Sequence, residues 1–320
     1  MSAGGSTVRL PAPATVPTLY FIGVTTGQSS IQTVFPRWAE ALGLGEVRLQ
    51  GIDLAPHAPR DDYRRVVDFI AGDPLSAGAL VTTHKIDLYD AASDLFDEVD
   101  PLALLMGETS CLSKRDGRLV CHAKDPISAG LAIDAILPDG YWEQTGAEVS
   151  LMGAGGSSIA ISWYLTRPER GADRPARIVV SNGSPQRLET IRRVHDEIGT
   201  DVPVETVHSP TPDGNDAILA ALAPGSFVVN ATGLGKDAPG SPLTDQAHFP
   251  ADAVAWDLNY RGDLVFLDQA REAGHVRVED GWVYFLHGWT QVIAEVFDLD
   301  VPTSGPEFDA LGEIAARSRR

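Results

Sequence analysis

The chain has 320 residues, of which 43% are apolar and 22% charged, with a formal net charge of −19. This length predicts two domains, and no apolar run is long enough to cross a bilayer. The negative charge argues against nucleic-acid and membrane-surface partners and leaves a small-molecule ligand. Cys111 and Cys121 are the only cysteines, so the fold is not expected to depend on disulfides, which fits a cytoplasmic location. The eight histidines show no metal-ligand spacing, and no metal is expected.

The first half of the chain alternates short apolar runs with stretches of helical spacing. Residues 1–16 are small, polar and rich in proline, and are expected to form a flexible leader. Strands are expected at 18–26, 46–54 and 77–84, and helices at 34–44 and 61–72. This alternation predicts parallel βαβ units. Residues 108–125 then read as a hairpin with Asp116 and Gly117 at its turn.

A second series of elements follows a helical stretch at 126–146, where the chain is expected to cross between domains. Strand, turn and helix are expected within 147–168 and again within 176–198, and further strands at 202–208, 226–233 and 253–260. The segment from residue 290 is helical, and 298–313 read as a solvated tail. The fold class predicted is α/β with two domains, the second a doubly wound dinucleotide domain.

A glycine-rich turn, LMGAGGSS at 151–158, lies between a predicted strand and a predicted helix. The first glycine allows the tight turn, and the second lets backbone N–H groups approach a pyrophosphate at the helix N-terminus. Ser158 takes the place of the usual third glycine and is small enough for close packing. The turn predicts a dinucleotide site, although it could be purely structural. The residues assigned to that site are Gly153, Ala154, Gly155, Gly156 and Ser157.

The end of the next predicted strand, VVSNGSPQR, carries no acid that could bind the ribose 2′-hydroxyl of NAD. Asn182, Ser184 and Arg187 stand there instead, and a hydroxyl and a guanidinium can bind a 2′-phosphate. We therefore expect NADP to be preferred, with NAD possible. The alternative is that Arg187 is an ordinary surface residue.

Six segments, in the same order, resemble segments of the shikimate dehydrogenase family over nearly the whole chain. They are GVTTGQSSIQTVF, LVTTHK, GETSCLSKRDGRLVCHAKD, LMGAGGSS, VVNATGLG, and WDLNY followed by LDQAREAG. The resemblance implies a substrate domain of residues 17–128, joined by the C-terminal segment 288–320, and a Rossmann-type domain of residues 129–287, with an active-site cleft between them. It also implies reversible hydride transfer between a nicotinamide cofactor and a ring hydroxyl of a cyclic polyhydroxy acid.

The resemblance assigns roles to particular residues. Lys85 and Asp125 correspond to the catalytic pair that flanks the oxidised hydroxyl, where a lysine beside a carboxylate can relay the proton. The alternative is a structural ion pair or two solvated charges. The positions implied for substrate are Ser30, Gln32, Ser110, Tyr260 and either His287 or Gln291. Asn230, Ala231 and Thr232 are implied for the cofactor.

Several departures from the family fall at positions implied for substrate. Gln32 replaces a serine, Val81 aligns with a threonine, Ser110 replaces an asparagine, and Lys124 replaces the threonine before the catalytic aspartate. Such changes alter ring-hydroxyl contacts and add a cation at 124, so a relative of shikimate, used in aromatic amino acid biosynthesis or specialised metabolism, is expected.

Two rivals stay open: a binding or regulatory protein that has lost turnover, and a dehydrogenase for an unrelated small alcohol or amine. His84 could line the pocket beside Lys85, and His122 could be a partner of Asp125. The protein is expected to be a monomer or a homodimer.

Overall fold

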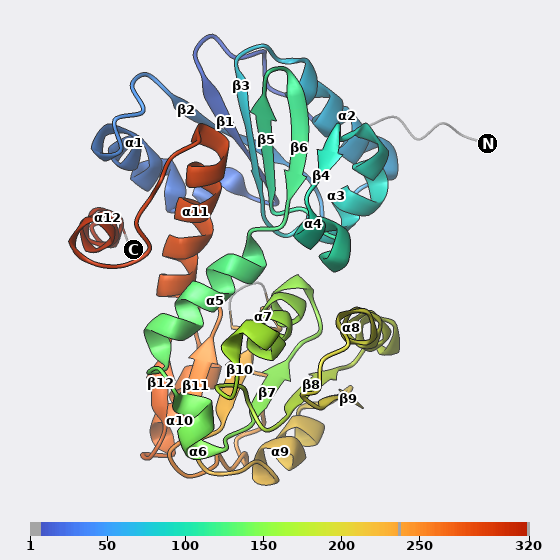
Figure 1. The fold of residues 1–320 in the computed structure, drawn as a ribbon, viewed down its shortest axis with the longest axis vertical. Coiled ribbons are helices and arrows are strands. Elements are labelled where there is room, and N and C mark those ends of the chain that lie inside the picture. Colours follow the sequence, from blue (N-terminus) through green and yellow to red (C-terminus); the bar gives the residue numbers. More distant parts are fainter. Residues whose placement is uncertain (1–7, 236–237, 319–320) are drawn as a thin grey trace. The chain divides into compact units, whose positions relative to one another are not determined.

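The structure is a computed structural model that describes residues 8–235 and 238–318 (Figure 1). The chain forms two compact units. Unit 1 comprises Met1–Lys124 and Gly288–Arg320, and unit 2 comprises Asp125–His287. Unit 2 is therefore one uninterrupted segment, whereas unit 1 is built from both ends of the chain.

The sheet of unit 1 is mixed, with strand order β2-β1-β3-β5-β6-β4. Its strands are β1 (Thr18–Gly23), β2 (Arg48–Asp53), β3 (Ser76–Val81), β4 (Glu98–Val99), β5 (Cys111–Arg115) and β6 (Arg118–His122). β1 pairs in parallel with β2 and β3, as the βαβ pattern predicts. β5 and β6 form the predicted antiparallel hairpin, and its turn residues Asp116 and Gly117 have φ of 50° and 77°.

Helices of unit 1 come from both parts of the chain. They are α1 (Ile31–Ala41), α2 (Arg60–Gly72), α3 (Lys85–Ala92), α4 (Pro101–Met106), the second part of α11 (Trp282–Phe297) and α12 (Pro306–Ala316). Short 3₁₀ turns lie at Thr26–Gln28 and Ser93–Leu95. α1 forms because Ile31, Val34, Phe35 and Trp38 recur at helical spacing, and all four are buried. α11 packs on β1 through an edge-on contact of Trp289 with Phe21, whose ring centroids are 5.1 Å apart.

Two terminal segments differ from expectation. The predicted solvated tail contains α12, which lies beside α1 and buries Phe308 and Leu311 (Figure 1). Trp38 Nε1 donates a hydrogen bond to the carbonyl of Leu311 at 2.8 Å. The helix agrees with the helical segment expected from residue 290, but its burial was not expected, because the glycine, proline and acids around its apolar residues suggested a solvated tail. At the other end, residues 8–16 are anchored through buried Val8 and through Ala14 N, which donates to Asp73, while residues 1–7 of the expected leader lie outside the described residues.

Unit 2 has a wholly parallel sheet with strand order β12-β11-β10-β7-β8-β9. Its strands are β7 (Val149–Met152), β8 (Ile178–Asn182), β9 (Val204–His208), β10 (Phe227–Asn230), β11 (Val254–Asp257) and β12 (Arg277–Glu279). Its helices are α5 (Asp125–Ile136), α6 (Tyr141–Thr145), α7 (Gly156–Thr166), α8 (Pro185–Ile198), α9 (Pro212–Ala220), α10 (Val265–Glu272) and the start of α11, with a 3₁₀ turn at Pro168–Arg170. The order runs outward in both directions from β7, which confirms the predicted doubly wound fold.

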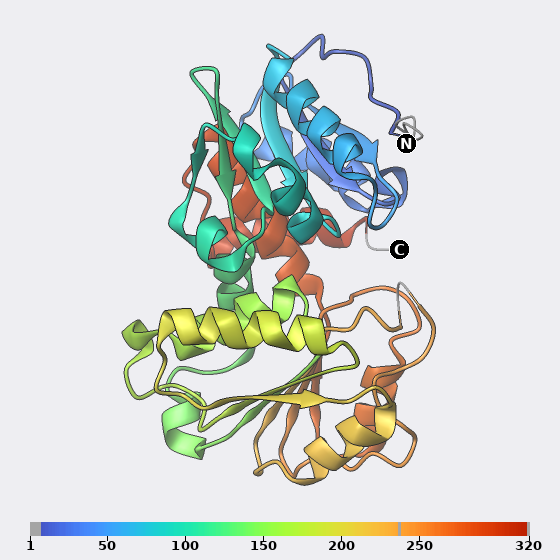
Figure 2. The ribbon, with the colours of Figure 1, turned by 90° about the vertical axis from the view of Figure 1, so that its right-hand side faces the viewer.

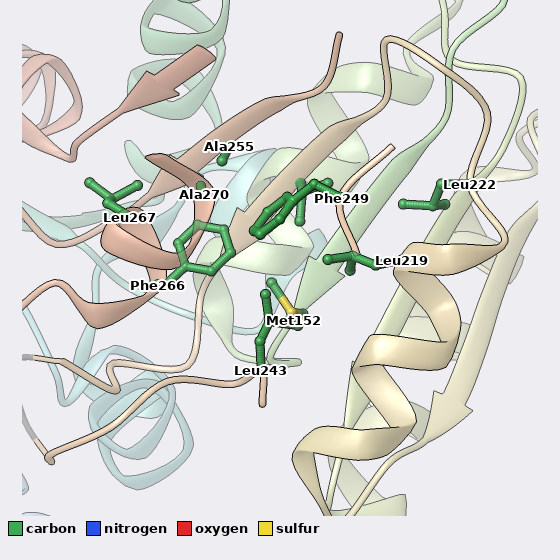
Figure 3. Packing of buried hydrophobic residues seen from close by; sticks show 10 residues of the cluster. Met152, Leu219, Leu222, Leu243, Phe249, Ala255, Phe266, Leu267 and Ala270 are labelled. Carbon is green, nitrogen blue, oxygen red and sulfur yellow. The ribbon is translucent and has the colours of Figure 1, made fainter. Parts of the chain in front are cut away.

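Helices cover both faces of this sheet: α8 lies on one face and α9 and α10 on the other (Figure 2). On the α9 and α10 side, Met152, Phe249, Leu219, Phe266 and their neighbours form one buried apolar cluster (Figure 3). Each large side chain buried in this way contributes about 1.5–3 kcal/mol of transfer free energy. The cluster stabilises the strands whose carboxyl ends carry the nucleotide turn.

α5 crosses α7 closely because Gly130 has no side chain. A Cβ at Gly130 would lie 2.1 Å from the ring of Tyr164, and the hydroxyl of Tyr164 donates to Asp134 of α5. Asp125, the first residue of α5, is thereby attached to the helix that begins at the nucleotide turn. No helix within the described ranges is long and apolar enough to cross a membrane.

Candidate active site

The nucleotide turn begins where β7 ends, and its first glycine is required by packing. Gly153 has φ of 109°, and a Cβ there would lie 2.6 Å from the carbonyl oxygen of Ala231. Its N–H donates to the carbonyl of Ser181 at 2.8 Å. The turn is therefore held between the ends of β8 and β10, at the point where the strand order reverses.

The second half of the turn is open to a ligand. Gly155 precedes α7, and apart from Gly155 itself and its two chain neighbours no described residue has a heavy atom within 4 Å of the position its Cβ would take. Gly156 and Ser157 form the first turn of α7, whose leading N–H groups have no partner within the helix. Ser158 Oγ donates to the carbonyl of Gly153 at 2.7 Å and so links the first turn of α7 to the start of the glycine turn. These features fit a pyrophosphate bound at a helix N-terminus.

The loops after β10 and β11 are joined by a buried network. Asn230 donates through Nδ2 to Asp257 at 2.9 Å and accepts through Oδ1 from the N–H and hydroxyl of Thr232, at 3.1 Å and 2.6 Å. Asp257 also accepts from the backbone and amide of Asn259, both at 2.8 Å. Burial raises the pKa of Asp257 despite these donors. Asn230, Ala231 and Thr232 thus lie beside the glycine turn, while the supporting Asp257 and Asn259 were not predicted from the sequence.

The residues assigned to the ribose lie at the ends of β8 and β9. Asn182 Oδ1 accepts from the N–H of Ser184 at 2.7 Å, and Ser184 stands immediately before α8. Arg187 is exposed in the first turn of α8. His208 is the strand partner of Asn182, and its Nε2 lies 3.1 Å from the carbonyl of Gly183. His208 is an additional polar group at this edge that sequence reasoning missed.

Lys85 is the first residue of α3 and is half-buried. Its carbonyl accepts from the N–H of Thr109 at 3.2 Å. The next residue, Ser110, is buried, and its Oγ accepts from the N–H of Lys124 at 2.6 Å. Two hydrogen bonds therefore connect the backbone of Lys85, through 109–110, to the residue that immediately precedes Asp125.

Asp125 begins α5 and is 7% exposed. Tyr284 Oη donates to its Oδ2 at 3.3 Å. Tyr284 was not predicted, because it lies 159 positions away in the chain and only the fold brings it to the carboxylate. A hydroxyl that donates to one carboxylate oxygen fixes the orientation of the group.

The cation expected at Lys124 is present but is paired. Its Nζ lies 2.5 Å from Glu295 Oε2 on α11, and Arg115 Nη2 lies 3.0 Å from the other oxygen. Burial acts to raise the pKa of Glu295, but the hydrogen bond from Lys124 and the nearby positive groups hold it below its usual value. Lys124 is therefore one half of an ion pair rather than an isolated charge.

The two histidines considered for the site have other partners. His122 Nδ1 lies 3.1 Å from Asp100 and its Nε2 lies 2.8 Å from Ser113 Oγ, so the structure shows it in a network of unit 1. His84 is fully buried against Tyr63, and burial lowers its pKa, which contradicts a role lining an open pocket.

Three further positions assigned to substrate, Ser30, Gln32 and Tyr260, have local contacts of their own. Ser30 precedes α1, and Gln32 in its first turn donates to the carbonyl of Thr26 at 3.2 Å. Tyr260 packs against the rings of Trp282 and Phe285.

His287 and Gln291 lie four residues apart on α11. His287 is buried, which lowers its pKa to about 4, whereas Gln291 is half-buried. The described residues contain no group of three or more histidine, cysteine or acidic side chains that could hold a metal.

The doubly wound sheet, the open glycine turn and the second α/β unit, which carries Lys85, define a dinucleotide-binding protein of two α/β units. No family model matches the chain. Over 213 residues it is 30% identical to shikimate dehydrogenase (NADP(+)) of Symbiobacterium thermophilum, covering 66% of this chain and 68% of the relative. It is 26% identical over 284 residues to the enzyme of the same name from Methylocella silvestris, covering 89% and 91%.

Solved structures share the fold. Quinate dehydrogenase from Corynebacterium glutamicum, in complex with NAD, superposes with a TM-score of 0.73 at 22% identity, covering 94% of this chain and 99% of that one. Shikimate 5-dehydrogenase from Thermus thermophilus, in complex with NADP(H) and shikimate, gives 0.68 at 22% identity with the same coverage. The chain belongs to the shikimate dehydrogenase family, whose members are NAD(P)-dependent oxidoreductases that act on a hydroxyl group.

Proposed function

We propose that the protein is an NADP-dependent dehydrogenase that reversibly oxidises a ring hydroxyl of a cyclic polyhydroxy acid of the shikimate or quinate kind. The relatives named shikimate dehydrogenase (NADP(+)) support the reaction and the cofactor. The observation that carries the assignment is a pair of hydrogen bonds, in which the N–H of Thr109 donates to the carbonyl of Lys85 and the N–H of Lys124 donates to Ser110 Oγ. They bring Lys85 to the same edge of the sheet as the residue that leads into Asp125.

The proposed roles follow from the groups present. The bound cofactor would supply the hydride acceptor for the carbinol carbon. Lys85 would take up the hydroxyl proton and pass it on, and Asp125, oriented by Tyr284, would accept a hydrogen bond from the reacting group. Gly153, Gly155 and the first turn of α7 would hold the pyrophosphate.

The substrate is proposed to differ from shikimate in its ring hydroxyls. Ser110 is shorter than the asparagine it replaces, and its oxygen already accepts the N–H of Lys124. The side-chain amide of Gln32 already donates a hydrogen bond to the carbonyl of Thr26. A polar group of the substrate left without a partner costs about 1–3 kcal/mol, enough to change which cyclic acid is preferred. The same substitutions favour the second candidate, a binding protein of this fold without turnover.

A substrate panel separates the two candidates. Shikimate, quinate and further cyclic hydroxy acids are incubated with NADP or NAD, and the absorbance of the reduced nicotinamide is followed. Turnover with one of these acids supports the dehydrogenase. Cofactor binding without turnover on any of them supports the binding protein.

Variants of the proposed pair test the mechanism. Lys85→Ala is expected to lower kcat by roughly 10² or more, the usual scale for a positioned acid or base. Lys85→Arg should not restore the rate, because a guanidinium does not release its proton near neutral pH. Asp125→Asn should cause a similar loss, and the double variant should be far less than multiplicatively worse. If Lys85→Ala keeps most of the activity, the catalytic assignment is wrong.

We also propose a cytoplasmic location, which the two free thiols of Cys111 and Cys121 fit. A monomer or a homodimer is proposed for the assembly, and light scattering of the purified chain measures it.

A further inference from the structure

Tyr63 of α2 forms a hydrogen bond with His84, the residue immediately before Lys85. Its Oη lies 3.0 Å from Nδ1 of His84, and the two rings are tilted with centroids 5.7 Å apart. Both side chains are almost completely enclosed, Tyr63 at 1% exposure and His84 at 0%. A hydrogen bond between two such groups is costly to break, because water cannot replace the lost partner.

The same hydroxyl also reaches the other side of Lys85. Tyr63 Oη donates to Asp87 Oδ2 at 3.3 Å, and Asp87 lies in the first turn of α3. One oxygen atom of α2 therefore joins the residue before Lys85 to the residue two positions after it. Asp87 is oriented further by the exposed His57, whose Nδ1 lies 3.0 Å from the same carboxylate oxygen.

Two arginines of α2 bind the C-terminal turn of α3. Arg60 and Arg64 donate to the carbonyls of Asp90 and Ala91 at 2.9 Å and 3.0 Å. These bonds hold the last turn of α3 from the exposed side. Tyr63 is the member of the set that acts at the first turn, where Lys85 stands.

The tyrosine and the histidine are both neutral near pH 7. Burial raises the pKa of Tyr63 to about 12, with the charge of Asp87 adding to the effect. Burial lowers the pKa of His84. The bond between them is therefore a neutral one that does not depend on either group being charged, which suits a fixed support better than a proton carrier.

We propose that Tyr63 is a positioning residue for Lys85: by bonding His84 and Asp87 it fixes the first turn of α3 and so the direction of the lysine side chain. The inference rests on the proposed function, in which Lys85 relays the proton. Tyr63 itself acts through its neighbours and does not touch the reacting atoms. An error of about 1 Å in the place of a catalytic group can cost as much as 10² in rate, so a loosened first turn is detectable.

The chain offers a matched control. Tyr20 of β1 is also fully buried and donates through Oη to an aspartate, Asp73, at 2.5 Å. Asp73 precedes β3, whereas Lys85 follows it, so the two tyrosines act at opposite ends of the same strand. Tyr63→Phe and Tyr20→Phe each remove one buried hydroxyl and keep the ring.

The experiment measures kcat, both KM values and Tm for these two variants with the substrate found in the panel. Both are expected to lower Tm by a few degrees. Tyr63→Phe is expected to lower kcat roughly tenfold with KM for NADP unchanged, while Tyr20→Phe keeps the kcat of the parent protein. In a Lys85→Ala background, Tyr63→Phe should cause no further loss of rate, because the group it positions is gone.

The outcomes separate the inference from the function. If Lys85→Ala impairs turnover but Tyr63→Phe has the same kcat as Tyr20→Phe, the inference is wrong and the function stands. If Lys85→Ala retains the rate, the catalytic assignment of Lys85 is wrong, and the inference that Tyr63 positions it falls as well, while the dehydrogenase activity itself stands.

Should Tyr63→Phe not fold, Asp87→Ala removes the partner on the partly exposed side. It is then expected to lower kcat about threefold at unchanged KM for NADP, and an unchanged kcat would overturn the inference.

Discussion

Replacing Gly153 by alanine tests whether the nucleotide turn is as closely packed as the structure shows. The new Cβ would lie 2.6 Å from the carbonyl oxygen of Ala231 and 3.1 Å from the nitrogen of Thr232, both backbone atoms that cannot rotate away. A φ of 109° is also unfavourable for alanine. The backbone strain costs about 1–2 kcal/mol and the overlap about 1–3 kcal/mol. A total of about 2–5 kcal/mol lowers the Tm of a unit of this size by roughly 5–15 °C.

Gly155→Ala is the matched variant, because its Cβ meets no described atom within 4 Å and its φ is −94°. It is expected to leave Tm unchanged. If the pyrophosphate lies against this part of the turn, the added methyl group should weaken NADP binding roughly tenfold, which is about 1.4 kcal/mol. Calorimetric unfolding gives the first quantity, and titration of nicotinamide fluorescence gives the second.

The two variants therefore separate folding from binding. A Gly153→Ala protein whose Tm stays within a degree of the parent would show that the approach to Ala231 is not close. A Gly155→Ala protein that binds NADP as tightly as the parent would remove the turn from the cofactor site.

Two further predictions concern unit 2. His195 is buried, with Nε2 2.8 Å from Ser162 Oγ, and burial lowers its pKa to about 4. The pKa of this histidine is near 6.5 in the unfolded chain and about 4 in the folded protein, so between these pH values only the unfolded chain binds the proton. The stabilisation is therefore complete above about pH 6.5 and is lost as the pH falls to about 4. The loss in unfolding free energy amounts to about 3 kcal/mol. Denaturant unfolding measured between about pH 6.5 and about pH 4 should show that the unfolding free energy of His195→Gln falls less steeply with pH than that of the parent protein. An identical slope for both proteins would refute the burial argument. Arg187→Ala is expected to raise KM for NADP and leave KM for NAD nearly unchanged, and equal weakening of both would show that Arg187 does not contact the 2′-phosphate.

The fold class could be predicted because local signals agree with the final topology. Apolar runs of strand length alternate with helical spacing, and the glycine turn falls between a strand and a helix. The hairpin of β5 and β6 was equally readable from Asp116 and Gly117. Helix at the C-terminus was expected, but the packing of α12 was not, because the acids and glycines around its apolar residues suggested a solvated segment, and only the fold brings Leu311 to Trp38.

Supporting residues of the site were beyond sequence reasoning. Tyr284 reaches Asp125, and Glu295 reaches Lys124, across more than 150 positions of chain. Asp257 is buried under the loop after β10; it stands in the WDLNY segment, but its bond to Asn230 could not be predicted from that segment. Ring stacking, ion pairing and hydrogen bonds of this kind depend on tertiary geometry, which periodicity does not encode. The residues that carry a motif could be named, but the groups that orient them could not.

The division of unit 1 between the two ends of the chain has a consequence for how the protein matures during synthesis. Unit 2 leaves the ribosome as one continuous segment and can close its own sheet first. The first 124 residues contain all six strands of their sheet, but Phe21 and Trp38 receive their partners Trp289 and Leu311 only from the segment made after unit 2. Until then these two aromatic side chains lack those contacts, so the unit that carries Lys85 is the one whose apolar surface stays incomplete longest and is open to aggregation or to chaperones.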